Sequence, residues 1–378
     1  MSIISPVNFR ASAWLMAGLM LLIFWPASAQ VKDKGIPYVN HYPKQVYGGG
    51  TQNWDFVQTD DRILFVANNQ GVLKYNGLVW EKIPMPNRSV VRSLFKSNDG
   101  TVYVGAFNEI GYLGISATGR LEYRSLADSV PGAGKAGEFW SISSRGDYLY
   151  FQSYEALVVH NRASGSWRII KADDQIGFLN RAGEELYLNI RNRGLMKLDG
   201  EEMIPVRGGE FFGTHEVWQV AMVNGNLLVG TQNQGVFVVE NAGVRRWEAE
   251  VNGSLLRNKL FSFAQSEENL FWGTIQDGLF VTDKEGNIIT HINKNNGLSN
   301  NTVLSLLIDA EANLWMGLDN GIDQVLIHSP LSYLLTSGDI GAGYAAEFFE
   351  GRIFLGTNQG LFMVPGNLAK MPGEDRLP

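Results

Sequence analysis

The chain of 378 residues is 45% hydrophobic and 18% charged, with a formal net charge of −7 at pH 7. This composition excludes an intrinsically disordered chain, and the mildly acidic balance argues against nucleic acid or an anionic membrane as a direct ligand. The chain contains no cysteine, which excludes disulfides, thiolate metal sites and cysteine nucleophiles. A large core without disulfides is compatible with the bacterial periplasm.

The first 29 residues have the pattern of a signal peptide. Arg10 supplies a positive charge, residues 11–25 are apolar, and Ala27-Ser28-Ala29 matches the small-residue rule for cleavage. A short membrane anchor is the alternative, but the apolar stretch is shorter than the ~20 residues that span a bilayer. We therefore predict export to the periplasm and cleavage after Ala29.

From residue 63 onward, one pattern recurs eight times: an apolar run with a central large apolar or aromatic residue, a polar turn that usually contains glycine, and a second apolar run. The central positions, 37 to 47 residues apart, are Phe65, Tyr103, Tyr150, Tyr187, Leu228, Phe271, Trp315 and Phe354. A period near 40 residues built from short strands is typical of a β-propeller. A small residue follows the centre in six copies, whereas Gln152 and Asn189 depart from this pattern.

Each unit reads as four strands, here called A to D from the propeller axis outward. In the second unit we predict strands at 90–96, 101–106, 112–115 and 121–125, joined by turns rich in asparagine, aspartate and glycine. In such a meander the B–C turns and the D–A loops share one face, and the A–B and C–D turns share the other.

Counting the units predicts an all-β, seven-bladed β-propeller of four-stranded antiparallel blades, with the start of a further blade or second propeller. We place the signal peptide at 1–29, an opening segment at 30–50, the propeller at 51–330, and the incomplete eighth blade with its tail at 331–378. The alternative is that the strands of the eighth unit complete a ring with 39–48. In either case we expect the chain to be the front of a longer protein.

Few motifs in the chain carry chemistry. Residues 131–137 lack the first glycine and the Ser or Thr of a phosphate loop, and residues 283–287 read as a turn and not as a calcium loop. The five histidines include no pair at ligand spacing, and no Gly-x-Ser-x-Gly motif is present. We predict a non-enzymatic chain with no cofactor and no metal. An exported propeller lyase or hydrolase is the alternative, because residues at the top of a propeller can converge without being close in sequence.

A ligand site is predicted where the starts of strand A and the B–C turns meet around the axis. The candidate ligand-binding residues are Asn53, Trp54, Arg88, Glu138, Trp140, Asn180, His215, Trp218, Arg257, Asn258, Asn300 and Asn301. Flat aromatic rings combined with amides suit a small molecule or oligosaccharide, which stacks on the rings and hydrogen-bonds the amides. The competing interpretation is that the recurring aromatic of strand A packs between blades.

Residues 297–325 (GLSNNTVLSLLIDAEANLWMGLDNGIDQV) resemble the two-component regulator propeller repeat, although Ala310-Glu311-Ala312 replaces its usual glycine-bearing turn. Residues 39–80 resemble the opening blade of the same exported sensors, which occur in Bacteroidetes-type bacteria. The resemblance covers about 36–365. It implies a periplasmic sensor region of a signal-transduction protein anchored in the inner membrane, which passes a signal to a downstream kinase or transcriptional output. The partners we consider are the downstream signalling modules of the same protein and a second copy of the chain in a homodimer. A scaffold for protein–protein contacts is a further alternative.

Overall fold

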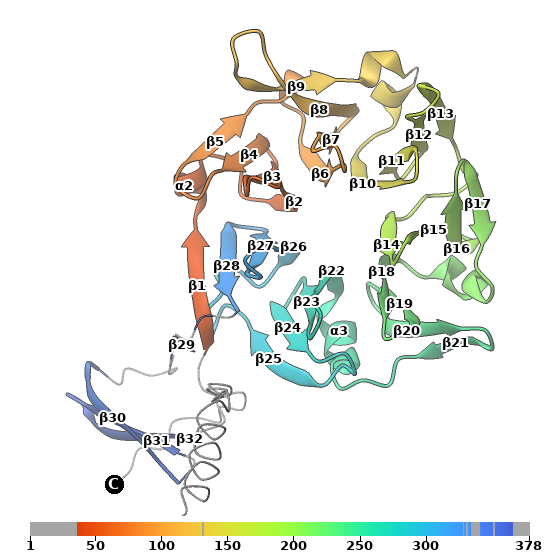
Figure 1. Cartoon of the computed structure of the whole chain (residues 1–378). Coiled ribbons are helices and arrows are strands. Elements are labelled where there is room, and N and C mark those ends of the chain that lie inside the picture. Colours follow the sequence, from red (N-terminus) through yellow and green to blue (C-terminus); the bar gives the residue numbers. More distant parts are fainter. Residues whose placement is uncertain are drawn as a thin grey trace, which may run out of the picture.

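The structure is a computed structural model that describes residues 36–365 except 131, 328, 330–331, 334–340 and 351. The predicted signal peptide lies outside the described residues. Seven antiparallel sheets stand around a central axis like the blades of a propeller (Figure 1). In six of these sheets the strands follow one another in chain order from the axis outward, and the seventh takes its outer strand from the start of the described chain. The predicted fold class is confirmed.

Each blade is written here from strand A outward. The first three blades are β2–β5 (Asn53–Gln58, Leu64–Asn68, Gly71–Tyr75, Trp80–Ile83), β6–β9 (Val91–Lys96, Val102–Ala106, Glu109–Ile115, Leu121–Ser125) and β10–β13 (Phe139–Arg145, Tyr148–Ser153, Leu157–Asn161, Ser166–Ile170). The next three are β14–β17 (Asn180–Ala182, Glu185–Ile190, Gly194–Asp199, Glu202–Pro205), β18–β21 (Val217–Val223, Asn226–Thr231, Gly235–Glu240, Gly243–Arg246) and β22–β25 (Leu260–Gln265, Leu270–Thr274, Leu279–Thr282, Ile288–Ile292).

The seventh blade combines both ends of the propeller. Its inner strands are β26 (Val303–Ile308), β27 (Leu314–Leu318) and β28 (Ile322–Leu326), and its outer strand is β1 (Ile36–Tyr42) from the start of the described chain. β1 pairs antiparallel with β28, with Val39 opposite Val325 and Tyr42 opposite Ile322. The short β29 (Ser332–Tyr333) adds to the other edge of β1. The ring is therefore closed by hydrogen bonds between segments about 280 residues apart.

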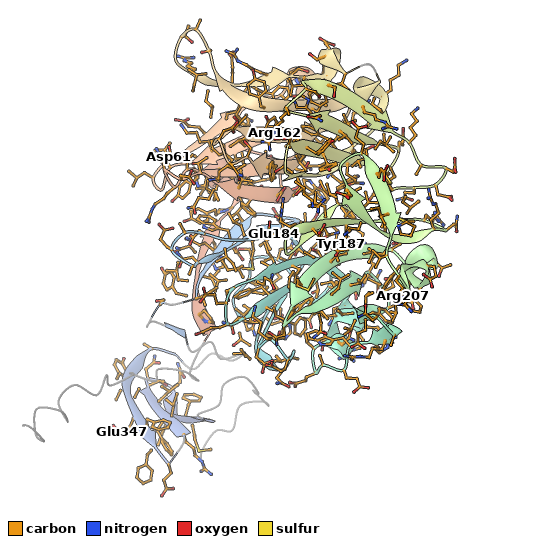
Figure 2. The ribbon with its side chains drawn as sticks, turned by 45° about the vertical axis from the view of Figure 1, so that its right-hand side comes forward. Asp61, Arg162, Glu184, Tyr187, Arg207 and Glu347 are labelled. Atoms are coloured by element: carbon orange, nitrogen blue, oxygen red, sulfur yellow. The ribbon has the colours of Figure 1, made fainter. Side chains whose placement is uncertain are left out.

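The eighth unit forms its own three-stranded sheet, β30 (Gly343–Phe349), β31 (Arg352–Thr357) and β32 (Gly360–Pro365), which lies apart from the ring in Figure 1 and carries Glu347 in Figure 2. Apolar side chains that would be buried in a ring are exposed here, among them Tyr344 at 78%. This sheet corresponds to the predicted start of a further blade.

In the described ranges the helices are few and short: α2 (Lys44–Tyr47), α3 (Asn252–Asn258) and the 3-10 turns at Pro86–Arg88, Ala127–Ser129, Ala133–Lys135 and Gly209–Thr214. Among the residues that the structure describes, no helix has the length and apolar character needed to cross a bilayer. The 132–137 segment lies in the D–A loop between β9 and β10, as the sequence predicts.

The core is divided into layers between neighbouring blades. Residues of β3 and β4 in the first blade, for example, pack on β6 and β7 in the second (Phe65 and Val72 against Leu94 and Val104), and the side chains drawn in Figure 2 fill such spaces. Strand B is buried along its whole length in several blades, including β3, β23 and β27. This burial on both faces explains why the B strands read as continuous apolar runs.

The small residue of strand B marks close contact between blades. A Cβ atom added at Gly317 would lie 2.2 Å from Ser305 Oγ and 2.3 Å from the carbonyl oxygen of Asn53. Because the second of these atoms belongs to the backbone of the next blade, it cannot move aside cheaply.

We expect Gly317→Ala to lower the free energy of unfolding by about 3 kcal/mol, the upper end of the cost of overpacking. Urea denaturation of the purified chain measures this. Gly134→Ala is the matched control, because the nearest atom to its Cβ would lie 3.9 Å away. Equal midpoints for the two variants would contradict the packing argument.

Side chains near the inner ends of the blades link each blade to the next through a backbone group. The hydroxyls of Ser93, Ser262 and Ser305 donate to the carbonyls of Phe139, Val303 and Asn53 at 2.8, 3.0 and 3.1 Å. At the remaining junctions Gln219 donates to Phe261 O (2.7 Å), Gln152 to Ile176 O (3.0 Å), Asn189 to Phe212 O (3.1 Å), and Asp55 accepts from Leu94 N (2.9 Å). The two departures from the small-residue pattern, Gln152 and Asn189, thus complete this set of seven junctions.

Candidate functional site

Strand A carries a β-bulge in six of the seven blades that the structure describes. The bulged residues are Trp54, Arg92, Trp140, Trp218, Phe261 and Leu304, and all six line one central cavity of about 230 Å³. A bulge adds one residue to a strand and re-aims its side chain. The fourth blade has no bulge, and there Phe178, just before its short inner strand β14, takes the equivalent place in the cavity wall.

Five of these aromatic side chains form a closed circuit of contacts around the axis, which we call the collar (Trp54, Trp140, Phe178, Trp218 and Phe261). Their ring centroids are 5.6 Å apart for Trp54–Trp140, 5.9 Å for Trp140–Phe178, 4.7 Å for Phe178–Trp218, 4.3 Å for Trp218–Phe261 and 6.5 Å for Phe261–Trp54. Such aromatic contacts are energetically favourable beyond the area they bury. The recurring aromatics of strand A therefore meet at the axis and narrow the channel, and do not pack between blades.

Arg92 is held within the collar. Its guanidinium carbon lies 4.1 Å from the ring centroid of Trp54 and 4.5 Å from that of Trp140, a double cation–π contact. Its Nη2 forms an ion pair with Glu138 Oε1 at 2.6 Å. The Nη1 of Arg92 and the Nε1 of Trp140 are buried and have no hydrogen-bond partner among the described residues. Both donors belong to residues that line the cavity and are unsatisfied within the described part of the chain.

A second cavity of about 310 Å³, which we call the side pocket, adjoins the collar between the fourth and fifth blades. It shares Phe178 and Trp218 with the collar. Its other lining residues are Tyr154, Gln175, Gly177, Asn189, Arg191, Asn192, Gly213, Thr214, His215, Glu216 and Val217. They come from B–C turns and from the loops that lead into β14 and β18, so the pocket lies on the predicted binding face.

Two titratable groups near these cavities have shifted pKa values. Burial raises the pKa of Tyr154 to about 12, and the carboxylates of Glu138 and Glu216 act in the same direction. Burial also raises the pKa of Asp55, which lines the central cavity, to about 7, although its carboxylate accepts hydrogen bonds from the backbone N–H groups of Leu94 and Phe56. Burial therefore favours the protonated, neutral form of Asp55 in the cavity wall.

No protein-family model and no curated protein matches this chain. In structure it is similar to the extracellular domain of BT3049, assigned to a hybrid two component system of B. thetaiotaomicron, with a TM-score of 0.64 and 15% identity over 90% of this chain and 49% of that one. The extracellular domain of BT4673, assigned to a one component system of the same organism, gives 0.58 and 18% over 88% and 46%. Virginiamycin B lyase from Staphylococcus aureus gives 0.56 and 12% over 77% and 99%.

The shared feature is the propeller fold. At identities of 12 to 18% these similarities establish the architecture and no common activity. The chain spans about half the length of the two extracellular domains.

The structure brings together only part of the predicted ligand site. Trp54, Trp140, Asn180 and Trp218 line the central cavity, His215 and Trp218 line the side pocket, and Glu138 reaches the collar through Arg92. Their role in ligand binding stays a prediction.

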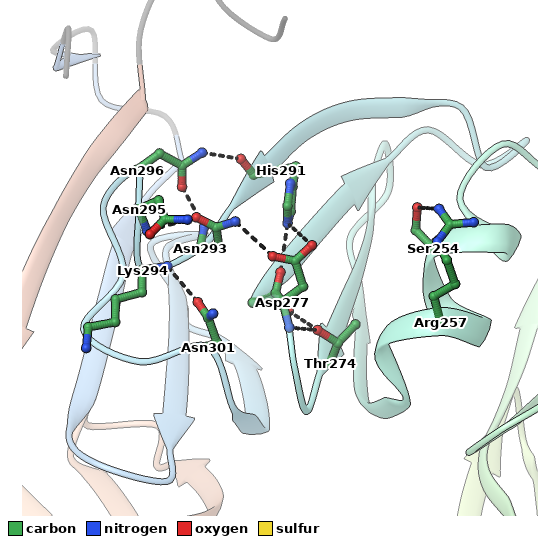
Figure 3. Close-up of polar contacts among 11 residues, drawn as sticks. Ser254, Arg257, Thr274, Asp277, His291, Asn293, Lys294, Asn295, Asn296 and Asn301 are labelled. Atoms are coloured by element: carbon green, nitrogen blue, oxygen red, sulfur yellow. Dashed lines mark hydrogen bonds and ion pairs between the residues drawn. The ribbon is translucent and has the colours of Figure 1, made fainter. Parts of the chain in front are cut away.

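The remaining predicted residues line neither cavity. Asn53 is fully buried and its amide donates to Gly321 O at 2.8 Å, which is a structural role. Arg88 and Arg257 are exposed, and Arg257 contacts Ser254 within α3 (Figure 3). Asn300 and Asn301 accept from backbone N–H groups of their own loop, and Figure 3 shows the bond from Lys294 N to Asn301 (2.7 Å). The carbonyl of Asn258 accepts from Gln276 N at 3.2 Å.

Sequence reasoning missed Arg92, Asn189, Arg191 and Glu216. The one available signal was the departure of Asn189 from the small-residue pattern. In the B–C turn of the sixth blade, Asp277 accepts from Asn293, which follows β25, at 2.8 Å and lies 3.4 Å from His291 Nε2 (Figure 3). This cluster fixes a loop and borders neither cavity.

A serine, a histidine and an aspartate meet where β1 closes the ring. Asp323 Oδ1 lies 2.8 Å from His41 Nδ1 and accepts from Ser299 Oγ at 2.7 Å, and Ser299 Oγ lies 2.9 Å from the same His41 nitrogen. In a hydrolytic triad the serine and the aspartate contact different nitrogens of the imidazole. This group, which we call the clasp, therefore ties β1 to the seventh blade. Within the described part of the chain, no group of three or more metal-binding side chains gathers at one place.

Proposed function

We propose that this chain is the exported, non-catalytic sensory region of a membrane signal-transduction regulator. The observation that carries the proposal is the fold shared with the extracellular domain of BT3049 over 90% of this chain, at a TM-score of 0.64. The repeat pattern and the apolar leader of the sequence support the same assignment. A downstream kinase or transcriptional output, inner-membrane anchoring and a homodimer are parts of the proposal.

The proposed ligand is a glycan fragment that binds at the face formed by the B–C turns and D–A loops. The collar offers flat aromatic surfaces, and two of the residues that line the cavity carry buried donors without a partner among the described residues, Arg92 Nη1 and Trp140 Nε1. A ligand acts on the output by binding one arrangement of the downstream modules more tightly than another, which shifts the balance between the two. The blades stay rigid in this mechanism, since every junction is linked through side-chain hydrogen bonds to the backbone.

The rival function is that of an exported propeller enzyme, because virginiamycin B lyase has the same architecture. The two functions differ in whether a bound ligand is released unchanged. A scaffold for protein–protein contacts would bind no small ligand at all.

Calorimetric titration of the secreted chain with neutral and acidic oligosaccharides tests the ligand. We expect saturable binding that Trp140→Ala weakens at least about tenfold, because stacking and cation–π contacts on an aromatic ring are each worth about 1 kcal/mol or more. Trp167→Ala is the matched control, since Trp167 lies on β13 and stacks on His160 away from the axis. If no oligosaccharide binds, the glycan is excluded as the ligand. If both variants lose the same amount of affinity, the collar is excluded as the binding site.

A further inference from the structure

Asn189 is the residue of the side pocket that calls for an explanation. It stands where β7, β19, β23 and β27 carry glycine, and it is 5% exposed. Its Nδ2 donates to the carbonyls of Phe212 and His215, both at 3.1 Å, which fixes the orientation of the amide. Its Oδ1 is buried in the pocket wall and accepts no hydrogen bond from any described residue. A buried acceptor without a donor costs about 1–3 kcal/mol of stability, and the Oδ1 of Asn189 carries this cost while the pocket is empty.

The pocket also holds two opposite charges that are not paired. Arg191 follows β15 in the fourth blade, and Glu216 precedes β18 in the fifth. Both residues are exposed, and within the described chain neither side chain forms an ion pair or a hydrogen bond, with the other or with any third residue. The two walls of the pocket therefore present one free cation and one free anion to whatever enters between them.

Aromatic rings form the inner end of the pocket. Tyr154 lies 6.0 Å from Phe178, and Phe178 lies 4.7 Å from Trp218. Because Tyr154 keeps its proton, its hydroxyl adds a neutral donor and acceptor. The volume of about 310 Å³ is at the lower end of the range of small-molecule sites.

We infer that the side pocket binds a zwitterion of the α-amino acid class. The ligand carboxylate pairs with Arg191, and the ligand ammonium donates to Glu216 and to the free Oδ1 of Asn189. The aromatic end of the pocket holds the ligand side chain. Water solvates the exposed Arg191 and Glu216 while the pocket is empty, so neither charge demands a partner. A zwitterion forms a charge-assisted contact with each of them, a simple anion or cation with only one, and a neutral sugar with neither. The site goes beyond the proposed function, because its charged groups Arg191 and Glu216 lie outside the collar, although the two cavities share Phe178 and Trp218.

The test is calorimetric titration of the full chain with L-phenylalanine, L-alanine and L-glutamate, and with the methyl ester and the N-acetyl derivative of phenylalanine. We expect binding of the free amino acid and a loss of at least about tenfold for each blocked form, since each removes one charge-assisted contact. Arg191→Gln should abolish the preference for the free acid over the ester. Glu216→Gln should abolish the preference over the N-acetyl form. Arg193→Gln is the matched control, because Arg193 is an exposed neighbour that does not line the pocket.

Three results would overturn the inference. The first is the absence of binding by phenylalanine, alanine and glutamate alike. The second is equal affinity for the free and blocked forms, which would make the pocket a plain aromatic slot. The third is binding that Arg191→Gln and Arg193→Gln weaken equally. The oligosaccharide titration is run on the same variants and should be unaffected by Arg191→Gln, so a failure here leaves the proposed function standing.

Discussion

Asp323→Ala is expected to lower the free energy of unfolding by about 3 kcal/mol, because it removes the buried centre of the clasp. The Asp323 side chain is fully buried, and its Oδ2 accepts from Ser299 N at 2.7 Å while its Oδ1 contacts His41 and the Ser299 hydroxyl. Without the carboxylate, these donors lose their partner in the seventh blade, where β1 pairs with β28 and closes the ring.

Urea denaturation followed by tryptophan fluorescence measures the effect. Asp60→Ala is the control, since the Asp60 side chain is 87% exposed and its ion pair with Lys96 is of the surface kind that contributes little. Limited proteolysis adds a local readout, because loss of the clasp should expose β1 to cleavage before the other blades. A stability equal to that of Asp60→Ala, with β1 still protected, would contradict the role of the clasp.

The second prediction concerns the pH dependence of stability. The pKa of Asp55 is about 7 in the folded chain, against an ordinary value of 3.8, because of burial. Between these values the folded state holds a proton that the unfolded state has released, so the free energy of unfolding falls as the pH rises. The slope from this one group approaches about 1.4 kcal/mol per pH unit within the window and vanishes above it.

Asp55→Asn should flatten the profile between about pH 4 and 7, whatever its effect on absolute stability, because the amide does not titrate. Denaturant midpoints at one-unit intervals measure the slope. Asp61→Asn is the control, since Asp61 is exposed in the turn after β2 (Figure 2). Parallel profiles for the wild type and Asp55→Asn would show that Asp55 titrates normally.

The fold could be predicted from the sequence because the repeat is encoded by residues that are close together in the chain. Each unit carries its own strands and turns, so counting the units predicts seven blades and the start of another. The closure was harder to predict, because the pairing of β1 with β28 joins distant segments and no local pattern selects it over the strands of the eighth unit. Only the geometry of the complete ring decides between them.

The collar shows a different limit. Alternation along a strand assigns side chains to faces only while each residue pairs with one partner. The bulge at Trp54 or Trp140 breaks this alternation and turns the indole side chain toward the propeller axis. A single sequence does not reveal a bulge. The recurring aromatic position on strand A could therefore be recognised, but whether its side chain points to the axis or to the next blade could not. Asn189 likewise departs visibly from the small-residue pattern of strand B. Its role became clear only from the structure, in which its amide donates to the carbonyls of Phe212 and His215.

The most direct test of the account is to incubate the purified chain with an oligosaccharide that it binds and to analyse both components. We predict stoichiometric binding, a change in tryptophan fluorescence from the collar, and recovery of the ligand chemically unchanged. Consumption of the ligand would assign the propeller to the enzymes, and the absence of retention across neutral and acidic glycans would contradict glycan sensing by this chain.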